Sequence, residues 1–285
     1  MAAKPANIIG MRLLVLAVFG AGWVFAAAPL AIVQPAISIM EGGTPDLPGA
    51  EHVPGETVYF SCRVANYTKG QDDKVRLAYS VQAFDPAGVA LSEPSHNNFE
   101  AEVGVQDRDW RPRIETEVVL PPLVPSGVYK ITVKVDDLVA KTTAQLDAPL
   151  RVRGHIIHSG TALAVQNLQL FRAENDNEPV AKPAYRPGDV VWARFDITGF
   201  QYGPANQVDV SYVTALVAAG GTVLWKQPEP AVEQSESFYP KRYIPAEFGL
   251  NLDKKMRPGE YAITVTVKDG VGNQTSEMRQ PFTVE

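Results

Sequence analysis

The stretch Arg257-Pro-Gly-Glu-Tyr-Ala-Ile-Thr-Val-Thr-Val-Lys-Asp269 has a counterpart at Pro125-Ser-Gly-Val-Tyr-Lys-Ile-Thr-Val-Lys-Val-Asp-Asp137. Each copy begins with a turn that contains Pro and Gly and continues with Tyr, Ile or Val at nearly every second position. An alternation of period two places the apolar side chains on one face of a β-strand. The sequence therefore predicts the same turn and strand twice, once near the end of each of two domains.

The repeat extends over most of the chain. The Pro-Gly-Glu at 54–56 returns as Pro-Gly-Asp at 187–189, and Gly188 lies 133 positions after Gly55. The same offset relates Tyr79 to Tyr212, so turns coincide with turns and strands with strands. A constant offset of this kind is typical of tandem homologous domains. We predict domains at 30–153 and 154–285.

Each copy contains about seven short segments of strand character separated by turn signals, and no amphipathic helix. This pattern favours antiparallel β-sandwiches and excludes parallel α/β folds. The expected strands are 36–40, 57–66, 75–84, 88–92, 115–120, 128–136 and 142–152, then 162–171, 190–199, 207–217, 221–226, 248–252, 260–268 and 275–284.

The N-terminus predicts export. Lys4 and Arg12 precede a run without charge from Leu13 to Val33, and Val24-Phe-Ala26 offers a small-residue cleavage site. This order is typical of a secretory signal, so we expect a signal peptide at 1–28 and a periplasmic or extracellular protein. The alternative is an uncleaved anchor at 13–33, because about 20 apolar residues can span a bilayer. Membrane contact is expected only through this segment.

Charge and cysteine content limit the remaining possibilities. The net charge is -6, and no basic stretch interleaves with aromatic residues, which argues against a nucleic-acid partner. Cys62 is the only cysteine, so no internal disulfide can form. In its expected strand it shares a face with Val58, Phe60 and Val64, which predicts a buried side chain.

The segments Leu123-Val-Pro-Ser-Gly-Val-Tyr129 and Met256-Arg-Pro-Gly-Glu-Tyr261 resemble the tyrosine corner of immunoglobulin-like and fibronectin type III domains. The resemblance implies two tandem immunoglobulin-like sandwiches, with each tyrosine hydroxyl bonded to nearby backbone. The chain departs from the immunoglobulin pattern in lacking a cysteine pair and a tryptophan at an evident core position. The short connection through Arg151 to His155 predicts domains packed end to end with limited swing.

Two variable regions are the candidate binding sites. Each combines aromatic and arginine side chains, which are common anchors of protein interfaces and of sugar-stacking surfaces. The alternative is that these residues pack edge strands onto the core. The candidates are Arg108, Trp110 and Arg111 in the first region and Tyr239, Arg242 and Tyr243 in the second.

The loop Glu174-Asn-Asp-Asn-Glu-Pro179 is the candidate metal site. Its oxygen-rich side chains resemble the Asn-Asp-Asn-x-Pro element of cadherins, which implies calcium binding by Glu174, Asp176 and Glu178. The alternative is that Asn and Asp serve turn geometry. No other cofactor is predicted.

Function is predicted as a non-enzymatic binding or structural module of the cell envelope with another protein as partner. The chain contains no Gly-x-Ser-x-Gly, His-Glu-x-x-His or phosphate-loop motif, so no catalytic residue is assigned. Carbohydrate binding is one alternative, and it requires exposed aromatic rings. The other alternative is proteinase inhibition, because the order of turns and strands looks like that of bacterial proteinase-inhibitor domains.

Overall fold

The computed structural model describes residues 1, 28–107, 109–158 and 160–285. The regular structure in this part of the chain is β-strand, apart from the 3₁₀ turns η1 (Val105–Asp107) and η2 (Pro204–Asn206). The expected all-β class is therefore confirmed. None of the described residues forms a helix that is long and apolar enough to cross a bilayer. Most of the expected leader lies outside the described residues.

The strands of the first half, residues 31–152, form two sheets. One has the order β1-β3-β6 and the other β2-β8-β7-β4-β5, and all pairs are antiparallel except the short β2–β8 pair. The strands are β1 (Ala31–Ser38), β2 (Glu51–His52), β3 (Thr57–Ala65), β4 (Lys74–Phe84), β5 (Ser95–Glu102), β6 (Arg113–Val119), β7 (Gly127–Asp137) and β8 (Thr142–Val152).

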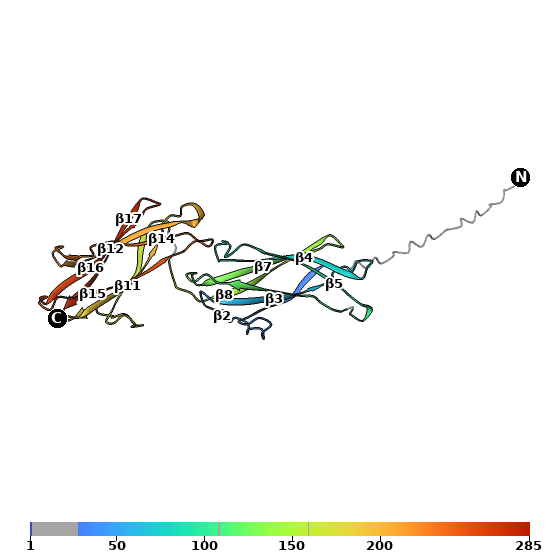
Figure 1. Cartoon of the computed structure of the whole chain (residues 1–285), viewed down its shortest axis with the longest axis horizontal. Coiled ribbons are helices and arrows are strands. Elements are labelled where there is room, and N and C mark those ends of the chain that lie inside the picture. The colour runs from blue at the N-terminus through green and yellow to red at the C-terminus, as the bar shows by residue number, and fades with distance from the viewer. Residues whose placement is uncertain (2–27, 108, 159) are drawn as a thin grey trace.

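The second half, residues 164–284, repeats this arrangement (Figure 1). Its sheets have the orders β9-β11-β15 and β10-β17-β16-β12, with β13 and β14 both paired to β12 at the outer edge. The strands are β9 (Ala164–Phe171), β10 (Ala184–Tyr185), β11 (Val190–Thr198), β12 (Val208–Ala218), β13 (Val223–Lys226), β14 (Ala231–Ser235), β15 (Ile244–Asn251), β16 (Gly259–Asp269) and β17 (Gln274–Val284).

Each half has its own apolar core between its two sheets. In the first core the inward residues of β3 meet the alternating residues of β7, and Cys62 is buried among them as expected. In the second core β11 meets β16 in the same way. The neighbouring inward residues Phe60 and Cys62 are replaced by Ala193 and Phe195, which keeps the filled volume nearly constant.

Two strand expectations in the first half were wrong. The first strand begins at Ala31, inside the run without charge, because a break in register at Gln34 and Pro35 lets the strand continue past the proline. The expected strand at 88–92 is a turn with one isolated bridge, and β5 lies further on. β5 escaped notice because it is an exposed edge strand of mostly polar residues.

Hydrogen bonds at the tyrosine corners match the expectation from sequence. The hydroxyl of Tyr129 donates to the carbonyl oxygen of Pro125 at 2.9 Å, and that of Tyr261 donates to Arg257 at 2.8 Å. Each bond ties the start of a long strand to the turn before it. The turn and the strand are therefore positioned together in both halves.

A buried aspartate in each half was not anticipated. Asp137 accepts the N–H of Val139 in its own hairpin and the N–H of Thr68 from the loop after β3, at 2.8 and 2.7 Å. Asp269 accepts the backbone N–H groups of Val271 and Gln201 in the same way. A carboxylate with several N–H donors compensates its own burial. These aspartates fasten one loop to one hairpin in both halves.

Replacing Tyr129 by phenylalanine is expected to lower the free energy of unfolding by about 1–2 kcal/mol, because the partly buried Pro125 carbonyl loses its donor. Tyr261→Phe should cost less than about 1 kcal/mol, since water can reach the Arg257 carbonyl. Urea denaturation of both variants measures the difference. Equal losses, or a larger loss for Tyr261→Phe, would contradict this account of the corners.

The Cys62 thiol is expected to be inert in the folded protein. Burial raises the pKa of Cys62 to about 12, so almost no thiolate forms at neutral pH. A chromogenic disulfide reagent should react with less than one thiol per chain in buffer and with one in denaturant. Rapid reaction in buffer would show that the first core is open to solvent.

Candidate functional site

The turn after β4 is held by the carboxylate of Asp85. Its Oδ1 atom accepts the N–H groups of Ala87 and Val89 at 2.9 and 2.8 Å. Gly88 completes the turn with a φ of +82°, which favours glycine. The side chain of Asp85 is almost fully buried. One carboxylate oxygen thus shapes the turn, and the other is left to face the second half of the chain.

The second oxygen of Asp85 receives two donors from the loop between β14 and β15. The Tyr239 hydroxyl donates to Oδ2 at 3.0 Å, and the Arg242 guanidinium forms an ion pair with the same atom. The ring of Tyr239 belongs to the apolar core of the first half, although the residue comes from the second half. The guanidinium carbon of Arg242 lies 5.4 Å from the centre of that ring. This loop therefore docks one half of the chain on the other.

The protonation states suit this arrangement at neutral pH. Burial raises the pKa of Tyr239 to about 12, so its hydroxyl remains a hydrogen-bond donor. Burial lowers the pKa of Arg242, but its bonds to Tyr239 and Asp85 outweigh that effect and raise the pKa above the ordinary value. At neutral pH the Tyr239 hydroxyl and the Arg242 guanidinium can therefore both donate to Asp85.

The connecting segment is fixed on both sides at His155. The His155 carbonyl accepts the N–H of Ser126 from the first half at 3.2 Å. In the second half, its Nε2 atom lies 2.6 Å from Oδ2 of the buried Asp196, and the ring of Tyr243 lies 5.2 Å from the imidazole ring. Asn167 also donates to Asp196 at 2.7 Å. These contacts support the end-to-end packing expected from the short connection.

The residues predicted in the second variable region are thus occupied inside the molecule. Tyr239 and Tyr243 are each only 6% exposed, and Arg242 is paired with Asp85. The carbohydrate-binding alternative requires exposed rings, and these two tyrosines do not meet that requirement.

The predicted residues of the first variable region lie at the opposite end of the first half. The Trp110 ring packs against Phe99 and Tyr67, with ring centres 5.8 and 6.4 Å apart, and remains 38% exposed. The Tyr67 hydroxyl donates to the Trp110 carbonyl at 2.8 Å, and the Arg111 carbonyl accepts from Arg63 at 3.1 Å. Arg108 lies outside the described residues. The two predicted groups therefore do not form one site.

The acidic loop at 174–178 is organised by an arginine. The guanidinium of Arg194 donates to the carbonyl oxygens of Glu174 and Asp176, the latter at 2.6 Å. The Asp176 carboxylate accepts the N–H of Ala173 at 2.9 Å, which is the turn role named as the alternative. A fixed positive charge on these oxygens opposes a cation at the same place. Within the described ranges, no group of three His, Cys, Asp or Glu residues could hold a metal.

An open groove of mixed polar and apolar lining lies between β13 and β15 at the edge of the second half. Its volume is about 570 Å³, and Leu224, Trp225, Met256 and Tyr261 line it. Asp253, Lys255 and Arg257 lie at the same groove and are exposed. The neighbouring residue Val223 is also exposed, so β13 presents an unusually apolar edge. The sequence predicted a strand at 221–226, but the exposure of its Val-Leu-Trp residues could not be read from the sequence.

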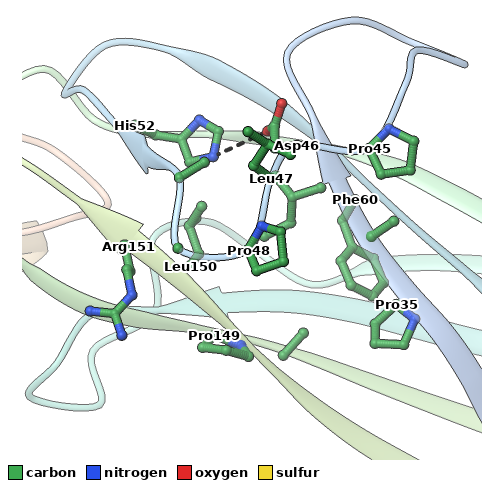
Figure 2. A pocket seen from close by; sticks show the side chains of 15 residues that line it. Pro35, Pro45, Asp46, Leu47, Pro48, His52, Phe60, Pro149, Leu150 and Arg151 are labelled. Carbon is green, nitrogen blue, oxygen red and sulfur yellow. Dashed lines mark ion pairs between the residues drawn. The ribbon is translucent and has the colours of Figure 1, made fainter.

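A second hollow, of about 360 Å³, lies beside β1 and β8 in the first half. Its lining is mostly apolar and rich in proline, and Figure 2 shows Asp46 and His52 facing one another at one side. The Nε2 atom of His52 lies 3.5 Å from Asp46, and its Nδ1 atom lies 3.4 Å from Glu56. Each ring nitrogen of His52 therefore lies near a carboxylate, although Oδ2 of Asp46 is buried without a hydrogen-bond partner among the described residues.

Comparisons with known proteins leave the family open. No protein-family model matches the chain, and no curated protein matches it. Among solved structures, a family 123 glycoside hydrolase from Clostridium perfringens, studied for glycolipid glycan hydrolysis, aligns at 11% identity with a TM-score of 0.30. The alignment covers 44% of this chain and 27% of that chain. A similarity of this size supports no conclusion about fold or activity.

Replacing Asp85 by alanine is expected to free the two halves to reorient, because Arg242 and Tyr239 lose their shared acceptor. Relaxation of backbone ¹⁵N nuclei measures the tumbling of each half. The wild-type halves should share one correlation time, and those of Asp85→Ala should differ.

The matched control is Asp147→Ala, which removes an exposed carboxylate that contacts Lys130 and Thr132 on the outside of the first half. Its two halves should tumble as in the wild type. Unchanged tumbling in Asp85→Ala would mean that other contacts fix the junction.

Proposed function

We propose that this chain is an exported, non-enzymatic module of two tandem immunoglobulin-like domains that acts through protein–protein contacts at the cell envelope. The domains are residues 30–153 and 154–285. The tyrosine corners, the paired three-stranded and larger sheets and the repeated strand order support the immunoglobulin-like assignment.

One observation carries the proposed mode of action: the groove between β13 and β15 is open and combines exposed apolar side chains with the charged residues Asp253, Lys255 and Arg257. The three consecutive residues Val223, Leu224 and Trp225 are all exposed. Exposed apolar residues on a protein surface more often occur singly. A tryptophan in a hollow beside aliphatic residues is the kind of anchor that dominates protein interfaces. The free edge of β13 also offers unpaired backbone groups to an approaching strand.

The junction supports a role for the module as a rigid spacer. Asp85 and His155 each bond to both halves, so the groove is held at a fixed distance from β1. Pro29, just before β1, lies at the far end of the first half, where its carbonyl accepts the Asn66 side chain at 2.9 Å. A module of this form would present the groove away from whatever holds its N-terminus.

Capture of partners by the exported chain tests the proposal. The tagged chain, recovered from an exporting host, should have lost residues 1–28 by mass spectrometry and should retain a defined protein from envelope or secreted fractions. Trp225→Ala should reduce that capture at least tenfold, since interface tryptophans commonly contribute more than about 1.4 kcal/mol.

The control is Val128→Ala, which truncates another exposed apolar residue in the first half. It should capture as much as the wild type, and both variants should unfold at the wild-type temperature. Capture that survives Trp225→Ala would remove the groove from the proposal. A chain that keeps its leader and stays in the cytoplasm would refute export.

A further inference from the structure

The outer face of the sheet β9-β11-β15 carries a tryptophan that lies flat on its surface. Along β11, Val191 and Ala193 are buried in the core, so Trp192 between them points outward. Its direct neighbour in β15 is Gly249. A Cβ atom added at Gly249 would lie 3.1–3.2 Å from three consecutive atoms of the six-membered ring of Trp192. An edge-on ring would give unequal distances, so the ring presents a face to the strand.

The opposite face of this ring is turned away from the sheet. Trp192 is partly exposed, and because one ring face lies towards β15, the exposed part of the indole is its outer face and its edge. Glycine at position 249 permits this arrangement, since a larger side chain would take the space of the ring. A flat aromatic ring on the outside of a sheet offers a π face to a ligand.

Trp192 lines a hollow between the loop after β9 and the start of β11. The volume of the hollow is about 540 Å³, which is in the range of sites for small organic ligands. The polar side chains around it are those of Arg172, Glu174, Asn175 and Asp189. The hollow shares no lining residue with the groove beside β13. It is therefore a separate candidate site.

The loop that supplies Glu174 and Asn175 is fixed beside the tryptophan. Arg194 lies two positions after Trp192 on the same face of β11, and its guanidinium donates to the carbonyl oxygens of Glu174 and Asp176. The backbone of the loop is thus held in place, whereas the side chains of Glu174 and Asn175 are exposed. Their polar groups are available to a ligand in the hollow.

The arginine that fixes this loop is specific to the second half. With the offset of 133 positions, Trp192 corresponds to Tyr59 and Arg194 corresponds to Ser61. A serine side chain is too short to hold a neighbouring loop through two of its carbonyl groups. The arrangement beside Trp192 is therefore an addition to the shared fold and is not required by it.

The side chains of the hollow favour a neutral ligand that is rich in hydroxyl groups. Arg172 is a hydrogen-bond donor, Glu174 and Asp189 are acceptors, and Asn175 is both. A hydroxyl group donates and accepts, so it can use each of these partners, whereas an ion of either sign meets a like charge. The C–H bonds of a sugar ring also pack well on the negative face of an indole such as that of Trp192.

We propose that the hollow beside Trp192 binds a neutral saccharide, with one sugar ring stacked on the indole and its hydroxyl groups bonded to Glu174, Asn175 and Asp189. This is a further activity of the module, and it does not depend on protein binding at the groove beside β13. An open hollow leaves much of a ligand in contact with water, so we expect a dissociation constant on the order of 0.1–1 mM.

Titration of the isotopically labelled exported chain with soluble saccharides tests the proposal. The probes are linear hexasaccharides of glucose, xylose, mannose and N-acetylglucosamine, each added to about 10 mM so that weak binding is saturated. At least one probe should shift the indole N–H signal of Trp192, which is assigned by its loss in Trp192→Phe. A Trp192 signal that no probe shifts overturns the proposal, as does a shift confined to Trp110 or Trp225.

Calorimetry of variants with the bound probe identifies the contacts. Trp192→Ala should weaken binding at least tenfold, because the stacking surface is lost. Glu174→Gln should weaken binding about threefold or more, because a carboxylate is a stronger acceptor than an amide. Glu174 is exposed, so this variant should fold normally and still tests the site if Trp192→Ala does not fold.

The matched control is Glu178→Gln, which removes the same charge from an exposed position of the same loop that does not line the hollow. It should bind the probe as the wild type does. Equal losses in Glu174→Gln and Glu178→Gln overturn the proposal, because they would reflect the charge of the loop and not a contact with the saccharide. Wild-type affinity in both Trp192→Ala and Glu174→Gln overturns it as well.

Discussion

The buried carboxylate of Asp85 is the constraint on which the arrangement of the two halves depends. Its first oxygen is committed to the turn after β4, and its second oxygen receives Tyr239 and Arg242 from the other half. A buried carboxylate without partners is strongly unfavourable, so the loop must place both donors correctly. Covering the apolar end of the first core would alone require only a hydrophobic side chain. The charge specifies which loop covers it and in what orientation.

The two halves consequently differ at the end that contains the tyrosine corner. The first is sealed, because Tyr239 completes the core around Tyr129. The second retains an open groove beside Tyr261, and Ala218 stands where Asp85 stands in the first. Equivalent positions of the two halves thus form an internal joint in one half and an external surface in the other. The difference lies in a few side chains at the ends, while strand order and core packing are shared.

Sequence patterns predicted the parts of this structure that depend on local periodicity. Alternation identified β3, β7, β11 and β16, and the repeated turn at Gly55 and Gly188 located the starts of β3 and β11. The patterns failed where a residue's partner is distant in the sequence. Asp137 and Asp269 look like ordinary turn residues, and β5 looks like a polar loop.

The candidate site shows the same limit more clearly. Tyr239, Arg242 and Tyr243 were predicted to bind a partner protein. In the structure Tyr239 and Arg242 contact Asp85 of the first half, and Tyr243 packs on His155 of the connecting segment. Sequence reveals that an aromatic and basic loop is suited to an interface, and it does not reveal which surface covers that loop. Trp225 was overlooked because β13 is an edge strand. Its exposure depends on which strands lie beside it, and the sequence of β13 does not reveal them.

A double-mutant cycle between Asp85 and Arg242 tests the central claim most directly. The free energies of unfolding of Asp85→Ala, Arg242→Ala and the double variant would be compared with that of the wild type by urea denaturation. Our account predicts a coupling free energy of about 2 kcal/mol or more between the two side chains, because the pair is largely shielded from solvent. Losses that add within about 0.5 kcal/mol would contradict it and would show that the junction does not depend on this pair.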